Sequence, residues 1–346
     1  MRQFESTGRD AFGLGNPKTY LPASSKVAFI NGAGMAVRGA KSIMAAILVG
    51  TASGCRVFKD AGEGEIELAG RQVSALSPEI GGSCLAVVDG KEVWRRAATS
   101  EWSKVTTTDI CLQSITVIDD TIFCGAMDEA VMMRICGNGE PERLKGFDIV
   151  PGCSEWFAGG PPLGVRSLTA TVDGAAILAA VHVGGIPRSE DKGETWIPTV
   201  PIMFDIHEVR SHPSFPNIVA AAAAVGLCIS HDSGRNWNVL SEGLNLTNSL
   251  AVAVLESEVL FSIQDGPFPK QSQLWRWPIG AKCVEQVRNG LPEWLEGKID
   301  TDHIAASAGR AALVDGGGNL WLSRDESCGW ERVAADLPYV SGLLIL

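Results

Sequence analysis

Short apolar stretches separated by glycine-rich turns recur along the whole chain. Examples are CLAVV, TIFCGA, ILAAV and LFSIQ, each followed within a few residues by Gly or Asp. Apolar runs of about 4–8 residues bounded by turn residues predict buried β-strands rather than helices. The chain also contains 39 glycines, as expected where many short strands are joined by tight turns. We therefore predict an all-β protein.

The strands are grouped into repeating units of roughly 37–55 residues, and three units share an eight-residue segment. These segments are SEDKGETW (Ser189–Trp196), SHDSGRNW (Ser230–Trp237) and SRDESCGW (Ser323–Trp330). Serine and aspartate side chains bond turn backbone, glycine adopts unusual dihedrals, and tryptophan anchors the strand that follows. Aligning the whole chain on the opening serine gives seven units, with this position at Phe58, Arg95, Arg134, Ser189, Ser230, Arg276 and Ser323.

The shared segment resembles the Asp-box, or BNR repeat, of bacterial propeller proteins of the WD40/YVTN-like, glycosyl-hydrolase-like type. The resemblance covers roughly residues 40–346 and is strongest from His182 to Gly243. It implies a seven-bladed β-propeller with four antiparallel strands per blade over residues 41–346, preceded by an N-terminal extension at residues 1–40. The tail YVSGLLIL is expected to supply the innermost strand of the first blade, which closes the ring and removes an exposed strand edge.

Two other interpretations of the repeats were considered. A β-helix or a pair of sandwiches would not explain four strands per unit with a turn motif before the fourth. The run VAAAAAVG, from Val219 to Gly226, would form a helix on propensity alone. The repeat alignment instead predicts that it is the second strand of its blade.

Composition narrows the function classes. The net charge is −11 and no dense Lys/Arg cluster occurs, so we expect no nucleic-acid partner. The longest membrane candidate, Ile43–Gly50, is too short to span a bilayer, and the N-terminus lacks the apolar region of a secretory signal. The nine cysteines are irregularly spaced without a C-x-x-C pair, which favours free thiols in a reducing, cytoplasmic location.

The repeat alignment gathers polar side chains on one face of the ring, where the innermost strands start and the second and third strands are joined. Three of the five histidines map to this face. Imidazole titrates near neutral pH, so histidines with a carboxylate can divide acid and base roles. The candidate catalytic residues are His182, His207, Glu208 and His303, with Asp205 and Asp302 as flanking carboxylates.

Other side chains at the same face are candidates for substrate binding: Gln113, Trp156, Arg166, Asn248 and Asp265. Arg166 would neutralise an anion, and Trp156, on the loop CSEWFAGGPPLG, would form an apolar wall. Each residue also has a structural alternative, in which the histidines bond loop backbone at strand starts and the arginine pairs with a nearby carboxylate. A divalent transition metal held by His182, His207 and His303 is an option, although no H-x-H pair supports it locally.

These observations favour an enzyme with hydrolase-like or lyase-like chemistry on a small polar or anionic molecule. Sialidases share the Asp-box, but their chemistry needs an arginine triad and a nucleophilic tyrosine. The two tyrosines here, Tyr20 and Tyr339, lie in the N-terminal extension and the closing strand, so sialidase activity is not expected. The alternative is a non-catalytic propeller that binds a protein or a small ligand, since photosystem assembly factors and sortilin-type receptors carry the same boxes and bind proteins.

Overall fold

The computed structural model describes residues 46–59, 62, 64–137, 139–157 and 163–346. By its contacts the chain divides into two units, residues 1–43 and 44–346. The N-terminal extension predicted at residues 1–40 lies outside the described residues. Within the described part, no helix is long and apolar enough to cross a membrane.

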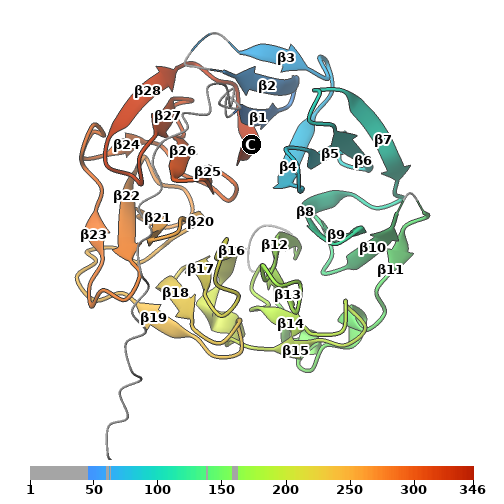
Figure 1. Cartoon of the computed structure of the whole chain (residues 1–346). Coiled ribbons are helices and arrows are strands. Elements are labelled where there is room, and N and C mark those ends of the chain that lie inside the picture. Colours follow the sequence, from blue (N-terminus) through green and yellow to red (C-terminus); the bar gives the residue numbers. More distant parts are fainter. Residues whose placement is uncertain (1–45, 60–61, 63, 138, 158–162) are drawn as a thin grey trace, which may run out of the picture. The chain divides into compact units, whose positions relative to one another are not determined.

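Seven antiparallel sheets form the blades of a ring, which confirms the predicted seven-bladed propeller (Figure 1). From the innermost strand outwards, blade 1 contains β29 (Val340–Ile345), β1 (Ile47–Thr51), β2 (Gly54–Phe58) and β3 (Glu65–Glu67). Blade 2 contains β4 (Val73–Pro78), β5 (Cys84–Val88), β6 (Glu92–Arg96) and β7 (Trp102–Thr107). Blade 3 contains β8 (Leu112–Ile118), β9 (Thr121–Ala126), β10 (Met132–Cys136) and β11 (Glu142–Arg143).

The remaining blades follow the same order. Blade 4 contains β12 (Val165–Ala170), β13 (Ile177–Val181), β14 (Pro187–Ser189) and β15 (Ile197–Pro198), and blade 5 contains β16 (Ile206–Ser211), β17 (Val219–Ala223), β18 (Gly226–Ser230) and β19 (Asn238–Leu240). Blade 6 contains β20 (Val252–Val254), β21 (Glu258–Gln264), β22 (Gln271–Pro278) and β23 (Glu285–Gln286), with β24 (Leu295–Glu296) also paired to β22. Blade 7 contains β25 (Ile304–Ser307), β26 (Arg310–Val314), β27 (Leu320–Ser323) and β28 (Trp330–Ala334). The short 3-10 helices are η1 (Phe147–Ile149), η2 (Cys153–Glu155) and η3 (Ile202–Phe204).

The C-terminal strand closes the ring as predicted. β29 pairs antiparallel with β1, and Ile345 lies opposite Ile47. Leu343 and Val340 pack in one apolar cluster with Ala312 of blade 7, so the last strand joins the first blade to the seventh. Without this strand the edge of β1 would present unpaired backbone groups to solvent.

The apolar core lies between neighbouring blades, and strand β17 shows how. Its side chains alternate, so Ala221 and Ala223 pack with residues of blade 4, whereas Ala220 and Ala222 pack with residues of blade 6. All four alanines are completely buried. Small side chains let both neighbours approach this strand closely, and that packing outweighs the helix propensity of the alanine run. The predicted second strand is therefore confirmed.

Two of the repeated segments form the same hydrogen-bonded turn before the outer strand. Ser189 Oγ accepts from the Gly193 amide at 2.9 Å and lies 2.8 Å from Asp191 Oδ1, while Asp191 also accepts from the Thr195 amide at 2.9 Å. The segment that starts at Ser230 repeats these three bonds. The third segment differs, because its glycine is displaced and Ser323 Oγ has no hydrogen-bond partner among the described residues.

Candidate functional site

Five innermost strands contain one extra residue near their start, opposite a continuous second strand. These bulged positions are Ser341, Ala75, Gln113, Arg166 and His207 in blades 1 to 5. A β-bulge interrupts the ladder and changes the direction of its side chain, and bulges often occur beside functional sites. Three of the residues predicted to form the site, Gln113, Arg166 and His207, therefore share one position in neighbouring blades.

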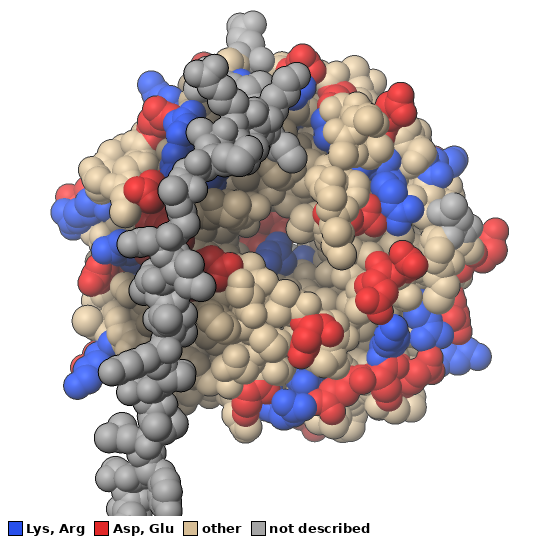
Figure 2. All heavy atoms as spheres, in the orientation of Figure 1, with Lys and Arg blue, Asp and Glu red and all other residues tan. Residues whose placement is uncertain are grey.

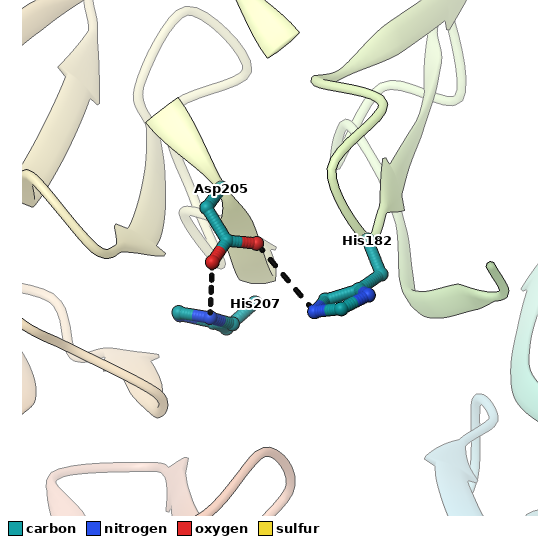
Figure 3. A group of neighbouring side chains, drawn as sticks. All are labelled: His182, Asp205 and His207. Atoms are coloured by element: carbon teal, nitrogen blue, oxygen red, sulfur yellow. Dashed lines mark ion pairs between the residues drawn. The ribbon is translucent and has the colours of Figure 1, made fainter. Parts of the chain in front are cut away.

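Blades 4 and 5 bring two histidines and an aspartate together (Figure 3). His182 follows β13, Asp205 lies between η3 and β16, and His207 occupies the bulge of β16. Asp205 Oδ1 lies 3.6 Å from His182 Nε2, and Asp205 Oδ2 lies 3.5 Å from His207 Nε2. One potential ligand atom from each side chain lies within 4.8 Å of the others. We call this group the His–Asp–His cluster.

Hydrogen bonding fixes the ring of His207. Its Nδ1 lies 2.7 Å from the Ser249 carbonyl oxygen in blade 6, which can only accept, so Nδ1 carries the proton. Nε2 consequently faces Asp205. Burial acts to raise the pKa of Asp205, but the imidazoles of His207 and His182 and the charge of Arg166 outweigh it and hold that pKa below its usual range. Asp205 thus stays a carboxylate near neutral pH.

The positive charge of Arg166 lies close enough to help lower the pKa of Asp205. The guanidinium group itself is held by two residues that precede blade 7. Its guanidinium donates to Asp300 Oδ1 at 3.2 Å and to the Thr301 hydroxyl at 2.9 Å. Asp300 is also paired with Lys298 at 2.5 Å. The Nε of Arg166 is buried and has no hydrogen-bond partner among the described residues. This arginine therefore retains a donor and a share of positive charge at the site.

His303 occupies a comparable place in blade 7 but stands apart from the cluster. Its Nε2 lies 2.9 Å from the Val340 carbonyl oxygen, so it bonds the start of the next blade, as His207 bonds Ser249. The other nitrogen, Nδ1, is buried and finds no partner in the described part of the chain. Burial lowers the pKa of His303. Among the described residues the group with metal-ligand spacing is His182, Asp205 and His207, and Asp205 takes the place that the sequence analysis gave to His303.

Glu208 belongs to a different network from the neighbouring His207. Its carboxylate accepts from the Val252 amide at 3.0 Å and pairs with Arg210 at 2.5 Å, and Arg210 also pairs with Asp302. The side chain has no exposed surface, and this burial raises the pKa of Glu208 well above its usual range. Two carboxylates share a single guanidinium here, which joins blades 5, 6 and 7 at the channel wall.

The other candidate binding residues lie around the same face without joining the cluster. Asn248 donates to the Gly266 carbonyl at 2.9 Å and braces the β21–β22 loop, on which Asp265 is exposed. Trp156 is half-buried against Phe147, with ring centroids 5.7 Å apart. Residues 158–162 of its loop lie outside the described part, so the predicted cover over the channel mouth stays a prediction.

The channel contains a cavity of about 810 Å³, and Figure 2 shows the hollow at the centre of the ring. Its wall is formed along the innermost strands and includes Ser114, Thr116, Ser167, Thr169, Arg210 and Asp302. The residues of the His–Asp–His cluster do not line it. The cavity and the cluster therefore lie at different levels of the channel, the cluster at the end where the innermost strands begin.

Sequence reasoning named two members of the cluster and noted the third, Asp205, only as a flanking carboxylate. The available signal was the spacing Asp-x-His at Asp205–His207, immediately before an innermost strand. The supporting groups, the Ser249 carbonyl and Asp300 with Thr301, were missed because they come from other blades.

No family model matches this chain, and no curated protein sequence does so either. Solved structures do resemble it. The GH74 enzyme of Niastella koreensis is 12% identical, with a TM-score of 0.56 over 82% of this chain and 46% of that one. An ancestral GH74 enzyme is 11% identical, with a TM-score of 0.56 over 80% of this chain and 38% of that one. YCF48 bound to D1 peptide is 15% identical, with a TM-score of 0.49 over 71% of this chain and 78% of that one.

The chain spans less than half the length of the two GH74 enzymes. At identities this low the likeness concerns the fold alone, and it agrees with the ring of seven blades. The fold and the site together define the class of protein, a seven-bladed β-propeller with a His–Asp–His cluster at one end of its channel.

Proposed function

We propose that this propeller is an enzyme that acts on a small anionic molecule at the end of the channel where the innermost strands begin. The observation that carries the proposal is the convergence of His182, Asp205 and His207 from two blades, with the charge of Arg166 acting on the same carboxylate. Imidazole and carboxylate groups beside a fixed positive charge suit proton transfer on a bound anion. The reaction would be hydrolase-like or lyase-like.

Arg166 would hold the anion in this scheme. Its guanidinium keeps Nε without an acceptor, and Asp300 is shared with Lys298, so the arginine is not fully neutralised. A carboxylate or phosphate of the substrate would complete its hydrogen bonds, in keeping with the planar geometry that guanidinium groups offer to such anions. The repeated turns at Ser189 and Ser230, which we interpret as Asp-boxes, lie before outer strands and would take no part in the chemistry.

The test is a binding and turnover screen with small carboxylates and phosphate esters. Calorimetry should show binding to the wild-type protein and at least about tenfold weaker binding to Arg166→Ala, since a hydrogen bond to a charged group contributes about 1.5–3 kcal/mol. Arg310→Ala is the matched control, because Arg310 begins β26 at the opposite end of blade 7. His207→Ala should lose turnover. Equal binding to the wild-type and Arg166→Ala proteins, or full turnover by His207→Ala, would reject the site.

A second candidate function is recognition of a protein partner, and the exposed apolar side chains favour it. Four large ones lie on loops that lead into innermost strands or join second to third strands: Phe157, Met203, Phe268 and Tyr339. These loops share the face of the His–Asp–His cluster. Exposed apolar groups that gather around one site are typical of binding surfaces. A stoichiometric partner lost from the double variant Met203→Ser, Phe268→Ser would support this function, whereas retention of that partner would count against it.

A further inference from the structure

The His–Asp–His cluster has the composition and spacing of a metal centre, and we infer that it binds one divalent transition-metal ion. The inference names the cofactor of the proposed site, and for any catalytic use of the ion it rests on the proposed function. Binding itself depends only on His182, Asp205 and His207.

The hydrogen bond of His207 to blade 6 fixes which of its ring nitrogens faces Asp205. The Ser249 carbonyl oxygen, 2.7 Å away, requires the proton on Nδ1, so a neutral ring directs the lone pair of Nε2 toward Asp205. The ionised carboxyl group of an aspartate such as Asp205 offers only lone pairs in return. Two facing lone pairs repel each other unless a positive centre lies between them. A cation bound between the two atoms would remove this repulsion.

The distances from the two histidines to Asp205 are also long for hydrogen bonds. A charge-assisted N–H···O bond between imidazolium and carboxylate would draw the two atoms to about 2.7–2.9 Å. The observed separations are longer, 3.5 Å for His207 Nε2 and 3.6 Å for His182 Nε2. Two ligand atoms about 2.1 Å from a tetrahedral ion lie about 3.4 Å apart. Each contact is therefore closer to the edge of a metal tetrahedron than to a hydrogen bond, with one oxygen of Asp205 facing each histidine.

Neighbouring groups hold the two histidines in place. Metal-binding histidines commonly donate the other ring N–H to a backbone carbonyl or a carboxylate, which sets the tautomer and the direction of the ring. His207 makes this bond to the Ser249 carbonyl oxygen, and the side chains of both histidines are buried. Asp205 itself adopts a left-handed conformation with φ of 50° at the end of η3, which aspartate tolerates.

The ligand set also indicates the kind of ion. Two imidazoles with one carboxylate suit borderline ions such as Zn²⁺, Co²⁺ or Fe²⁺, and they supply too few oxygen atoms for Ca²⁺ or Mg²⁺. Three protein ligands leave at least one position open for water or substrate, as in catalytic zinc sites. An ion there would be close to the charge of Arg166, which could hold an anionic group beside it.

The experiment uses the full chain after removal of metal with a chelator. Calorimetric titration with Zn²⁺ should give one ion per chain, and Co²⁺ should give the intense visible absorption of a tetrahedral complex. Asp205→Asn is the decisive variant, because asparagine also tolerates a left-handed backbone yet removes the charge. We expect its affinity to fall by more than the 10–100-fold that loss of a supporting hydrogen bond costs. His182→Gln should fall similarly.

His231→Gln is the matched control, since His231 is exposed and lies against the Trp277 ring rather than in the cluster. Thermal unfolding of each stripped variant checks that it is folded. Absence of stoichiometric binding, or equal affinity in the wild-type and Asp205→Asn proteins, would overturn the inference, as would loss of binding in His231→Gln. Metal binding without any effect of Arg166→Ala on anions would reject the proposed function and leave the metal site standing. Anion binding that depends on Arg166, without stoichiometric metal binding, would reject the metal site and leave the proposed function standing.

Discussion

Two tryptophans of the repeated turn segments differ in one hydrogen bond, and replacing each with phenylalanine isolates its contribution to stability. Trp196 and Trp330 are similarly buried, at 3% and 5% exposure. Trp196 Nε1 donates to the Gly193 carbonyl at 2.9 Å. Trp330 Nε1 is buried with no acceptor among the described residues. The two sites therefore match in size and burial but not in polarity.

The magnitude follows from this difference. Each substitution removes the same atoms, so the cavity cost should be comparable at the two sites and cancel in the comparison. Trp196→Phe also loses a hydrogen bond, a net cost of about 1 kcal/mol. Trp330→Phe removes a buried donor whose unmet bond already costs about 1–3 kcal/mol. Trp196→Phe should therefore destabilise the protein by about 2–4 kcal/mol more than Trp330→Phe.

Urea unfolding followed by far-UV circular dichroism measures both free energies. The comparison requires equal m-values, because a changed slope would indicate a different unfolding transition. If the two variants lose the same stability within about 0.5 kcal/mol, the assigned difference in hydrogen bonding is wrong.

Three further predictions concern ring closure, pH and the thiols. Deletion of residues 340–346 removes β29 and exposes the edge of β1, so light scattering should detect oligomers absent from the full chain; an unchanged state with native melting would contradict this. Burial lowers the pKa of His303 in the folded state, so the unfolded chain takes up the proton first and stability falls as pH drops below about 6.5. His303→Gln should flatten that fall by up to about 1.4 kcal/mol per pH unit, and parallel urea-unfolding profiles would refute it. Burial raises the pKa of four thiols to about 12, namely those of Cys55, Cys84, Cys124 and Cys228. In the native protein a thiol reagent should rapidly modify only the exposed cysteines, Cys136, Cys283 and Cys328. The buried thiols should react only when the protein unfolds. Rapid labelling of any buried thiol in the native state would contradict that burial.

The repeat pattern of the sequence was sufficient to predict most of the fold. Apolar runs at regular spacing and the segments opening at Ser189 and Ser230 were enough to count seven blades and to place Val219–Ala223 on a strand. The C-terminal YVSGLLIL was recognised as the missing inner strand because a ring of sheets cannot leave one edge unpaired. These features depend on local turn chemistry and on alternation along single strands, which a sequence records directly.

The candidate site was predicted less completely. Sequence reasoning treated His207 and His303 as equivalent, and each does bond the carbonyl of the next blade. His207 uses Nδ1 and turns Nε2 to Asp205, whereas His303 uses Nε2 and keeps Nδ1 buried without an acceptor among the described residues. His207 lies in the bulge of β16, whereas His303 precedes β25, whose pairing with β26 has no bulge.

The amino-acid sequence is sufficient to predict the architecture, because blade number, strand order and closure follow from periodic burial and turn residues. Which polar side chains meet can be seen only in the folded protein. A single extra residue in a strand redirects a side chain, and the partners of His182, His207 and Arg166 come from separate blades. Such contacts depend on the packing of one blade against the next, and no local pattern in the chain encodes them.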